Sequence, residues 1–407
     1  MGDPSELLKA LRGEKAEQSE FEQVVLEHFG HASQLSNEEI SYGPSQGGSA
    51  LKLIYDENGL LVGAQSGPDL KIDDIETLCR KVEEQLLTPG PIKVRRRILF
   101  TALPTRGWFR YRDQFQIVPM PEDAPQLKVV TGDHPFFLEF KFPSSSNFTV
   151  SHQRQERIGR ELELICSALF SWRVWSIGPQ VQFHWSIELK EGETQPRSKF
   201  LQEGYTWPGM RSEIDDFSEI NKLSPLAALD SQAYYTLRGI SVGQTLDIPA
   251  DLPILLDAVS KLSRRDRDRF LRASYWFQHA NSVFPLSKSA SFVALVSAVE
   301  ALSSGSQGSK RCKECGQSIG PGPTKLFADF VEAHLPDTSI PESERKRFYT
   351  LRSALSHGGK LLLGDHSLWG FTPKSLGEDT DMRALWQIVR TIFHNWLIRR
   401  NAAPAPQ

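Results

Sequence analysis

The stretch FYTLRSALSHGGK, residues 348–360, carries two side chains of types that can do chemistry near the end of an expected helix. Arg352 has a planar guanidinium that stays charged and can bind a phosphate through two parallel hydrogen bonds. His357 has an imidazole, a group that ordinarily titrates at about pH 6.5 and can therefore both accept and donate a proton near neutrality. Such a pair can hold a phosphate and move a proton beside it.

The position of the two residues on the helix limits how they can act together. The helix is expected to begin near Pro341 and to stop at Gly358-Gly359. Its apolar stripe consists of Phe348, Leu351 and Leu355. On a wheel of 3.6 residues per turn, His357 lies about 140° from Arg352, so the two side chains cannot meet across one straight helix. They can converge if the helix end turns at the glycines, or if a second copy of the helix faces the first in a symmetric dimer.

The region around this stretch has the spacing of a helical bundle. From about residue 251 onward, apolar residues recur at intervals of three and four. The amphipathic segments are 265–283, 289–302, 324–335, 341–356 and 381–400. Loops that carry Gly, Pro and Ser join them, so residues 251–402 are expected to form one all-α domain.

The first 245 residues read as a mixed α/β region in which antiparallel strands dominate, either as one unit or as two, 1–90 and 91–245. LKLIYDENGLLVGAQS predicts a hairpin that turns at Asn58-Gly59. FFLEFKF (136–142) and VQFHWSIEL (181–189) alternate like half-buried strands, and residues 154–172 predict a helix that packs on their sheet. The Gly- and Pro-rich segment 239–253 is the expected boundary. The fold class predicted for the whole chain is therefore α+β.

Composition excludes some classes of protein. The 407 residues are 39% hydrophobic and contain no run of about 18 apolar residues that would span a bilayer. The N-terminus lacks the pattern of a signal peptide, and four cysteines in a chain of this length do not make a disulfide framework. A cytoplasmic protein that does not enter a membrane is expected.

Charge is distributed unevenly along the chain. The net charge is −3, but residues 255–401 hold 21 Lys and Arg against 14 Asp and Glu, a charge of +7. This surplus favours a polyanionic partner, although basic domains are often simply soluble. A second basic group, Lys93, Arg95, Arg96, Arg97, Arg106, Arg110 and Arg112, alternates with apolar residues and is expected to be the solvated face of a sheet rather than a ligand site.

The C-terminal region resembles the HEPN superfamily, most closely its Apea-like branch. The resemblance is carried by the Arg-x4-His signature in LRSALSHGG, preceded by VSAVEAL and by RFLRASYWFQHA, and it covers residues 255 to 401. It includes Glu300, an acidic residue at the place where that branch usually has one. Many catalytic members have Asn, Asp or His directly after the Arg, whereas this chain has Ser353.

The resemblance implies a homodimeric, metal-independent endoribonuclease without a cofactor, acting in bacterial stress or anti-phage defence. His357 would be the general acid and base and Arg352 the ligand of the phosphate, with Ser353, Ser356 and Glu300 as orienting groups. The alternative is a non-catalytic module that dimerises or binds RNA. For Glu300 the residues also allow a simpler role, as the ion-pair partner of Arg352.

A pair of cysteines, Cys312 and Cys315, stands in a loop of the helical region. The spacing suits zinc, but a structural zinc site needs four ligands and a second cysteine pair is missing. Zinc at this loop, with His334 as a further ligand, and a loop with two free thiols both stay open. A metal-dependent enzyme built on this loop is the third possibility.

Overall fold

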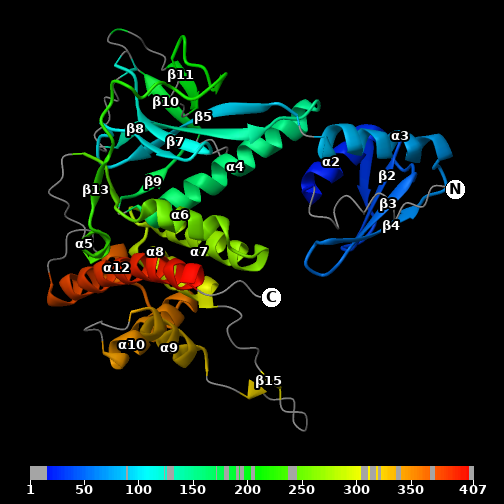
Figure 1. Ribbon diagram of the computed structural model, residues 1–407. Helices are drawn as coiled ribbons and strands as arrows, with labels where there is room; N and C mark the ends of the chain where they lie inside the picture. Colours follow the sequence, from blue (N-terminus) through cyan, green and yellow to red (C-terminus); the bar gives the residue numbers. More distant parts are fainter. Residues whose placement is uncertain are drawn as a thin grey trace. The chain divides into compact units, whose positions relative to one another are not determined.

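The computed structural model in Figure 1 describes residues 16–402 apart from positions 89, 123, 126–132, 171, 178–182, 189–191, 193–196, 203–206, 237–244, 304–309, 312–317, 320–321, 336–340 and 367–371. Antiparallel sheets occupy the N-terminal and middle parts, and helices follow from Leu252 onward. The predicted α+β fold class is confirmed. The described residues pack as two compact units: unit 1 lies within Met1–Arg95, Phe140–Gly159 and Glu213–Asp216, and unit 2 comprises the rest. The domain boundary expected at residues 239–253 stays a prediction.

Unit 1 is built on a four-stranded antiparallel sheet whose strands follow one another in chain order. Its main elements are α2 (Gln18–Phe29), β1 (His31–Gln34), β2 (Glu39–Gly43), β3 (Leu51–Tyr55), β4 (Leu61–Ser66), α3 (Ile72–Val82) and the π-helix η2 (Glu83–Leu87). The predicted hairpin is β3–β4. Its turn depends on Gly59, whose φ of +75° favours glycine, and on Asp56, whose Oδ1 accepts hydrogen bonds from the backbone N–H groups of Asn58 and Leu60.

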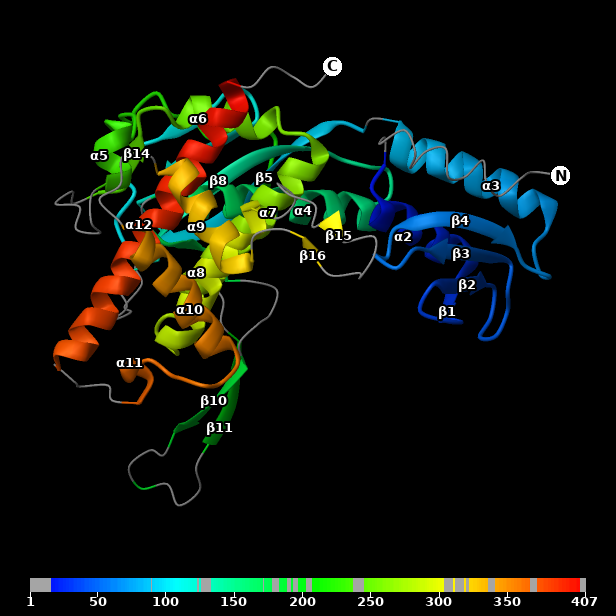
Figure 2. The same cartoon turned by 90° about the horizontal axis from the view of Figure 1, so that it is seen from below.

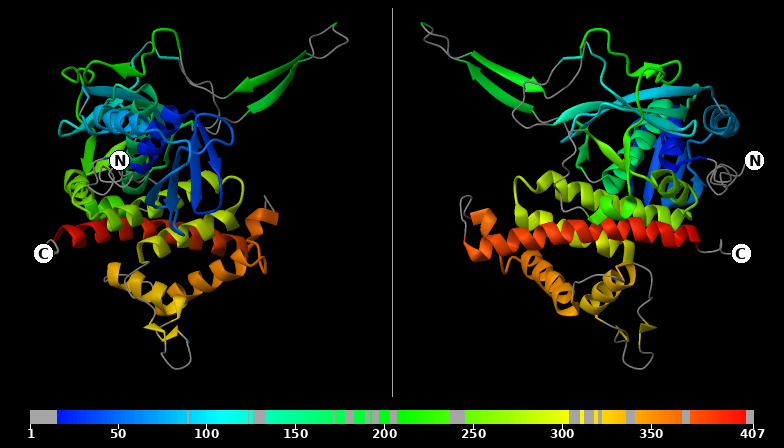
Figure 3. Two further views of the ribbon diagram at one scale, coloured as in Figure 1. Left: turned by 90° about the vertical axis from the view of Figure 1, so that its right-hand side faces the viewer. Right: turned by 60° about the vertical axis from the view of Figure 1, so that its left-hand side comes forward.

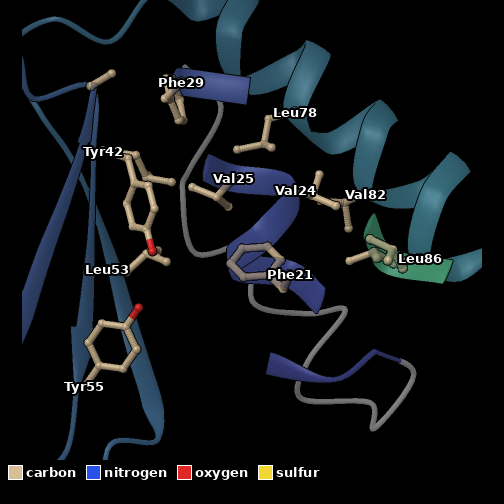
Figure 4. Packing of buried hydrophobic residues seen from close by; sticks show 13 residues of the cluster. Phe21, Val24, Val25, Phe29, Tyr42, Leu53, Tyr55, Leu78, Val82 and Leu86 are labelled. Carbon is tan, nitrogen blue, oxygen red and sulfur yellow. The ribbon is translucent and has the colours of Figure 1, made fainter. Parts of the chain in front are cut away.

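Buried and half-buried residues alternate along β3, and the buried ones form one side of the core of unit 1. Leu51, Leu53 and Tyr55 point to one face and are buried, while the residues between them are half-buried. Figure 4 shows side chains of this face meeting apolar side chains of α2 and α3, among them Phe21 and Leu78. The strand period of two and the helix period of 3.6 therefore bury their apolar faces against each other.

A six-stranded sheet has the order β12-β5-β8-β7-β6, with β9 paired to β5. Its strands are β5 (Ile92–Thr101), β6 (Phe109–Tyr111), β7 (Phe115–Pro119), β8 (His134–Pro143), β9 (Val174–Trp175) and β12 (Glu213–Ile214). Three further pairs are the antiparallel β10 (Phe183–Glu188) with β11 (Arg197–Gln202), the parallel β13 (Ala227–Leu229) with β14 (Asp247–Pro249), and the antiparallel β15 (Lys310–Arg311) with β16 (Ser318–Ile319). The helices in the same stretch of sequence, between β5 and β14, are α4 (Phe148–Leu169) and α5 (Ser231–Thr236).

Strand β8 is buried on both faces, so the prediction of a half-buried strand is wrong. Phe137 and Glu139, which alternate with the expected apolar positions, are 3% and 0% exposed. Phe137 is covered by Trp207, with ring centroids 6.1 Å apart, and by the guanidinium of Arg96, which lies 4.4 Å from the ring centroid. Alternation shows that a strand has two faces, but it does not show what covers the second one.

Two buried carboxylates explain the arginines of the middle region. Glu139 accepts hydrogen bonds from Arg96 Nε at 2.9 Å, from Gln116 Nε2 at 2.6 Å and from both N–H and O–H of Ser218 at 2.8 and 2.6 Å. Glu163 is bound in the same way, and its partners are Arg160, Ser176, Gln278 and, at 3.6 Å, Arg97. A buried carboxylate requires such partners. Arg96 and Arg97 are therefore internal counter-charges, and the prediction that they belong to a solvated face is wrong.

In the helical part of unit 2, the described residues form the five predicted helices and two more. Its elements are α6 (Leu252–Ser260), α7 (Arg264–Val283), α8 (Lys288–Ser303), α9 (Pro323–His334), α10 (Glu342–Ser356), α11 (Leu363–His366) and α12 (Pro373–Ala402). Helix α8 packs against α7, α9, α10, α11 and α12 (Figure 2). The long α12, red in Figure 3, also packs against α6 and α9. Among the described helices, none has both the length and the apolar character needed to span a bilayer.

An ion pair joins α12 to the start of α6. His394 Nε2 lies 2.7 Å from Asp251 Oδ2, and His394 Nδ1 lies 2.9 Å from Asn395 Oδ1. The ring of Tyr235 packs against His394. Arg390 is also buried, and it interacts electrostatically with Tyr235. Burial by itself would lower the pKa of His394, but the hydrogen bonds to Asp251 and Asn395 outweigh it and raise that pKa. The pKa of Asp251 is lowered, because its hydrogen bonds to His394 and Ser231 outweigh the effect of burial.

This pair predicts a pH dependence of folding stability. The folded-state pKa of His394 is raised, so its contribution is fully present below the ordinary histidine value of about 6.5 and is lost as the pH rises through the raised value. The contribution of His394 to the free energy of unfolding is therefore expected to fall as the pH rises above about 6.5, so the free energy of unfolding should change with pH differently in wild type and in His394→Gln. Urea denaturation followed by circular dichroism at several pH values measures both slopes. Equal slopes in the two proteins would contradict the assignment.

Candidate functional site

Arg352 and Glu300 form the centre of the candidate site. Arg352, on α10, donates a hydrogen bond from Nη2 to Oε2 of Glu300, on α8, at 2.8 Å. The predicted partnership of these two residues is confirmed. It forms because α10 packs on α8, with Phe348 against Phe292 at a centroid distance of 6.1 Å. The apolar stripe of α10 thus fixes which side of the helix carries Arg352.

Tyr349 is a third member of the site that the sequence did not single out. Its hydroxyl donates to Oε1 of Glu300 at 3.0 Å, and its ring lies 5.8 Å from the guanidinium carbon of Arg352. Burial and the negative charge of Glu300 raise the pKa of Tyr349, with Arg352 opposing them. The signal was present in the sequence, because Tyr349 precedes Arg352 by three residues and so lies on the same side of the helix.

The Arg352 side chain is partly exposed. Its exposed fraction is 26%, although its Nε atom is buried and has no hydrogen-bond partner among the described residues. Glu300 receives one donor on each carboxylate oxygen. The cluster therefore presents an oriented, partly exposed cation that is held by a carboxylate.

His357 occupies the C-cap of α10, and the chain turns immediately after it. The N–H of Gly359 donates to the carbonyl of Ala354 at 3.0 Å, and the N–H of Gly358 donates to the carbonyl of Leu355 at 3.2 Å. This pair of bonds is the Schellman motif, which requires a left-handed residue, and Gly358 has a φ of +70°. The predicted stop at the glycines is confirmed, and it leaves His357 exposed.

The remaining predicted residues are close in sequence but not joined to the cluster. Ser353 is half-buried and Ser356 is exposed. No hydrogen bond within the described part of the chain connects their hydroxyl groups, or the imidazole of His357, to Arg352 or Glu300. One copy of the chain thus brings together Arg352, Glu300 and Tyr349, and it leaves His357 at the helix end.

Asp365 fixes the segment that follows the glycines. Its carboxylate accepts hydrogen bonds from the backbone N–H groups of Lys288 at 2.6 Å and Ser289 at 3.0 Å, and from the hydroxyl of Ser287 at 3.0 Å. It therefore caps the N-terminus of α8 from a distant part of the chain. The hydrogen bonds to Ser289 and Lys288 outweigh burial and lower the pKa of Asp365. Nothing local in the sequence indicates this contact.

Cys312 and Cys315, the cysteines of the predicted zinc spacing, lie outside the described residues. His334 is described; its Nδ1 lies 2.9 Å from the carbonyl oxygen of Phe330, and burial lowers its pKa. Elsewhere in the described ranges, no three His, Cys, Asp or Glu side chains are grouped so that they could hold a metal ion.

The glycine turn can be tested by a matched pair of substitutions. Gly358→Ala places a side chain in the left-handed region, which costs about 1–2 kcal/mol. Gly359→Ala is the control, because φ is not positive there and the new Cβ would lie 3.6 Å from the carbonyl oxygen of Ala354, an ordinary contact. We expect urea denaturation to show a lower free energy of unfolding for Gly358→Ala only. Equal losses in the two variants would contradict the assigned motif.

Comparison of the chain with models of protein families, with curated proteins and with solved structures gives no match.

Proposed function

We propose that the chain is a metal-independent endoribonuclease of the HEPN type, whose catalytic groups are Arg352 and His357. The observation that carries the proposal is the oriented side chain of Arg352, held 2.8 Å from Glu300 and 26% exposed, on the same helix as an exposed histidine. The charge of +7 on residues 255–401 suits a polyanionic substrate. The family resemblance implies a cytoplasmic stress or anti-phage effector as the biological setting.

The chemistry uses the nucleophile that RNA itself supplies. His357 takes the proton of a 2′-hydroxyl, whose oxygen attacks the adjacent phosphorus, and the bond from phosphorus to the 5′-oxygen of the next nucleotide breaks. The leaving oxygen takes up a proton, which a protonated imidazole can supply. The products are a 2′,3′-cyclic phosphate and a free 5′-hydroxyl. Proton transfer of this kind contributes on the order of 10²–10⁴-fold to the rate.

Arg352 stabilises the charge that develops on the phosphate oxygens. A guanidinium suits this role because it stays charged and can donate two parallel hydrogen bonds to phosphate. Glu300 is a positioning residue because it accepts a hydrogen bond from the guanidinium, and Tyr349 is one because its hydroxyl donates to Glu300. They fix its orientation before the phosphate arrives, so that less reorganisation is needed in the transition state.

A second copy of the chain completes the site. Arg352 and His357 lie about 140° apart on one helix, so the two side chains of one copy point in different directions. Two copies related by a two-fold axis would place the His357 of each near the Arg352 of the other. The active form in this proposal is therefore a homodimer that joins through the helical part.

One observation favours a second candidate, a non-catalytic module that dimerises or binds RNA. The only ion pair that Arg352 makes in the described part of the chain is with Glu300, whose carboxylate competes with a phosphate for the same cation. If that bond persists when RNA binds, Arg352 contributes to packing rather than to catalysis.

The first test is cleavage of single-stranded RNA in the presence of EDTA. Wild-type protein is expected to cleave, and His357→Ala is expected to lose at least about a hundredfold in rate, because the proton carrier is gone. His31→Ala, which removes another exposed histidine, is the control. Size-exclusion chromatography and circular dichroism check that each variant is folded. Equal cleavage by His357→Ala and wild type would remove the site assignment.

A mixing experiment tests whether the site is shared between two copies. Arg352→Ala and His357→Ala are each expected to be inactive alone. If Arg352 of one copy works with His357 of the other, half of the dimers in an equimolar mixture are heterodimers with one intact site of two, and about a quarter of the wild-type rate returns. If both groups act within one copy, mixing restores nothing, and the dimeric site is refuted.

A further inference from the structure

Helix α7 has an exposed stripe of arginine and aromatic side chains that the proposed site does not use. Arg265, Arg272, Trp276 and His279 lie within about 60° of one another on the helical wheel, and Tyr275 lies beside them. From Arg265 to His279 the stripe runs about 21 Å along the helix axis. The opposite side of α7 carries Phe270 and Phe277, which are buried at 0% and 3% exposure. The stripe is therefore the outward face of a well-packed helix.

The aromatic part of this stripe is unusual for a solvent-facing helix. Tyr275 is 47% exposed and Trp276 is 37% exposed. The rings of Tyr275 and His279 are parallel within 4°, with centroids 6.1 Å apart, and Trp276 meets His279 edge-on at 5.9 Å. Their mutual packing holds three flat rings together without burying them. Such rings offer faces on which another planar group can stack.

The arginine part of the stripe is uncompensated, unlike the other arginines of the helix. Arg267 and Arg269 pair with Glu161 and Asp266. Arg265 and Arg272 are exposed and make no ion pair within the part of the chain that the structure describes. Asp268, three residues after Arg265 and four before Arg272, is the single acid of the stripe, so the stripe keeps a net positive charge.

We infer that this α7 stripe binds single-stranded RNA, with bases stacked on the rings and phosphates on Arg265 and Arg272. Aromatic faces next to unpaired cations are what a flexible nucleic-acid strand requires, and duplex RNA hides its base faces. A second copy of this chain fits less well, because a symmetric contact on the stripe would bring arginines against arginines. The inference rests on the proposed function only in the choice of RNA, and its test does not depend on cleavage.

The experiment measures binding of a fluorescently labelled single-stranded 12-mer RNA by anisotropy, using full-length His357→Ala so that cleavage does not interfere. We expect the further double change Tyr275→Ala and Trp276→Ala to weaken binding by about tenfold or more, since stacking on one base contributes a factor of roughly 5 to 150. Phe148→Ala is the matched control, because Phe148 is 83% exposed and stacks on His152 with the same spacing of four residues.

The charged half of the stripe is tested through salt dependence. Arg265→Ala together with Arg272→Ala is expected to reduce the slope of log affinity against log salt by about 1.4, since each phosphate contact on a single strand contributes about 0.7. Arg383→Ala, at another exposed arginine of the helical part, is the control. A duplex of the same sequence is expected to compete poorly with the labelled strand.

The outcomes separate this inference from the proposed function. Unchanged RNA affinity in the aromatic double variant overturns the inference, whether or not the wild type cleaves RNA. A change of oligomeric state in that variant, measured by sedimentation with RNA affinity unaltered, assigns the stripe to a protein interface and also overturns it. Loss of binding on changing the stripe supports the inference, even if wild-type protein shows no cleavage and the proposed function fails.

Discussion

Helix α8 has apolar side chains on nearly every side, so it is stable only when other helices surround it. Its buried residues are Ser289, Ser291, Phe292, Ala294, Leu295, Val296, Ala298, Val299 and Leu302. The helices that cover it, α7, α9, α10, α11 and α12, are held in place by this requirement. Glu300, near its C-terminus, is the acidic exception, and it can be tolerated there because α10 brings Arg352 and Tyr349 to its two oxygens. The geometry of the candidate site thus follows from the burial of α8 by the surrounding helices.

Unit 2 handles buried charge in two different ways. Glu139 and Glu163, each with three or more donors and almost no exposure, are closed clusters in which every partner belongs to the protein. The Glu300 cluster is partly exposed, with side-chain exposures of 26% for Arg352 and 29% for Glu300. Closed clusters suit packing, since an unpaired buried charge is costly. The open cluster leaves its ion pair within reach of solvent.

Periodicity in the sequence was enough to predict the helices and their faces. Phe270, Ala273 and Phe277 on α7, and Leu385, Val389 and Ile392 on α12, are buried as expected. Local spacing could not reveal contacts between distant segments. Glu139 and Arg96 are 43 residues apart, and Lys288 and Asp365 are 77 apart. The ion pair of Arg352 with Glu300 was predictable. Few acidic residues lie beside the apolar face of a helix, and one that does needs a basic partner. The roles of Arg352 and His357 in catalysis stay a prediction.

Asp365 fixes the length of the segment that follows Gly359. Its carboxylate accepts hydrogen bonds from the first turn of α8, and Asp365 lies six residues after Gly359. An insertion between these points would move the carboxylate away from Lys288 and Ser289 and would leave two helix-start amides without an acceptor. Natural variation in loop length is therefore expected to be strongly restricted here, and the spacing from the histidine to this aspartate would be a more durable mark of related chains than the loop's own residues.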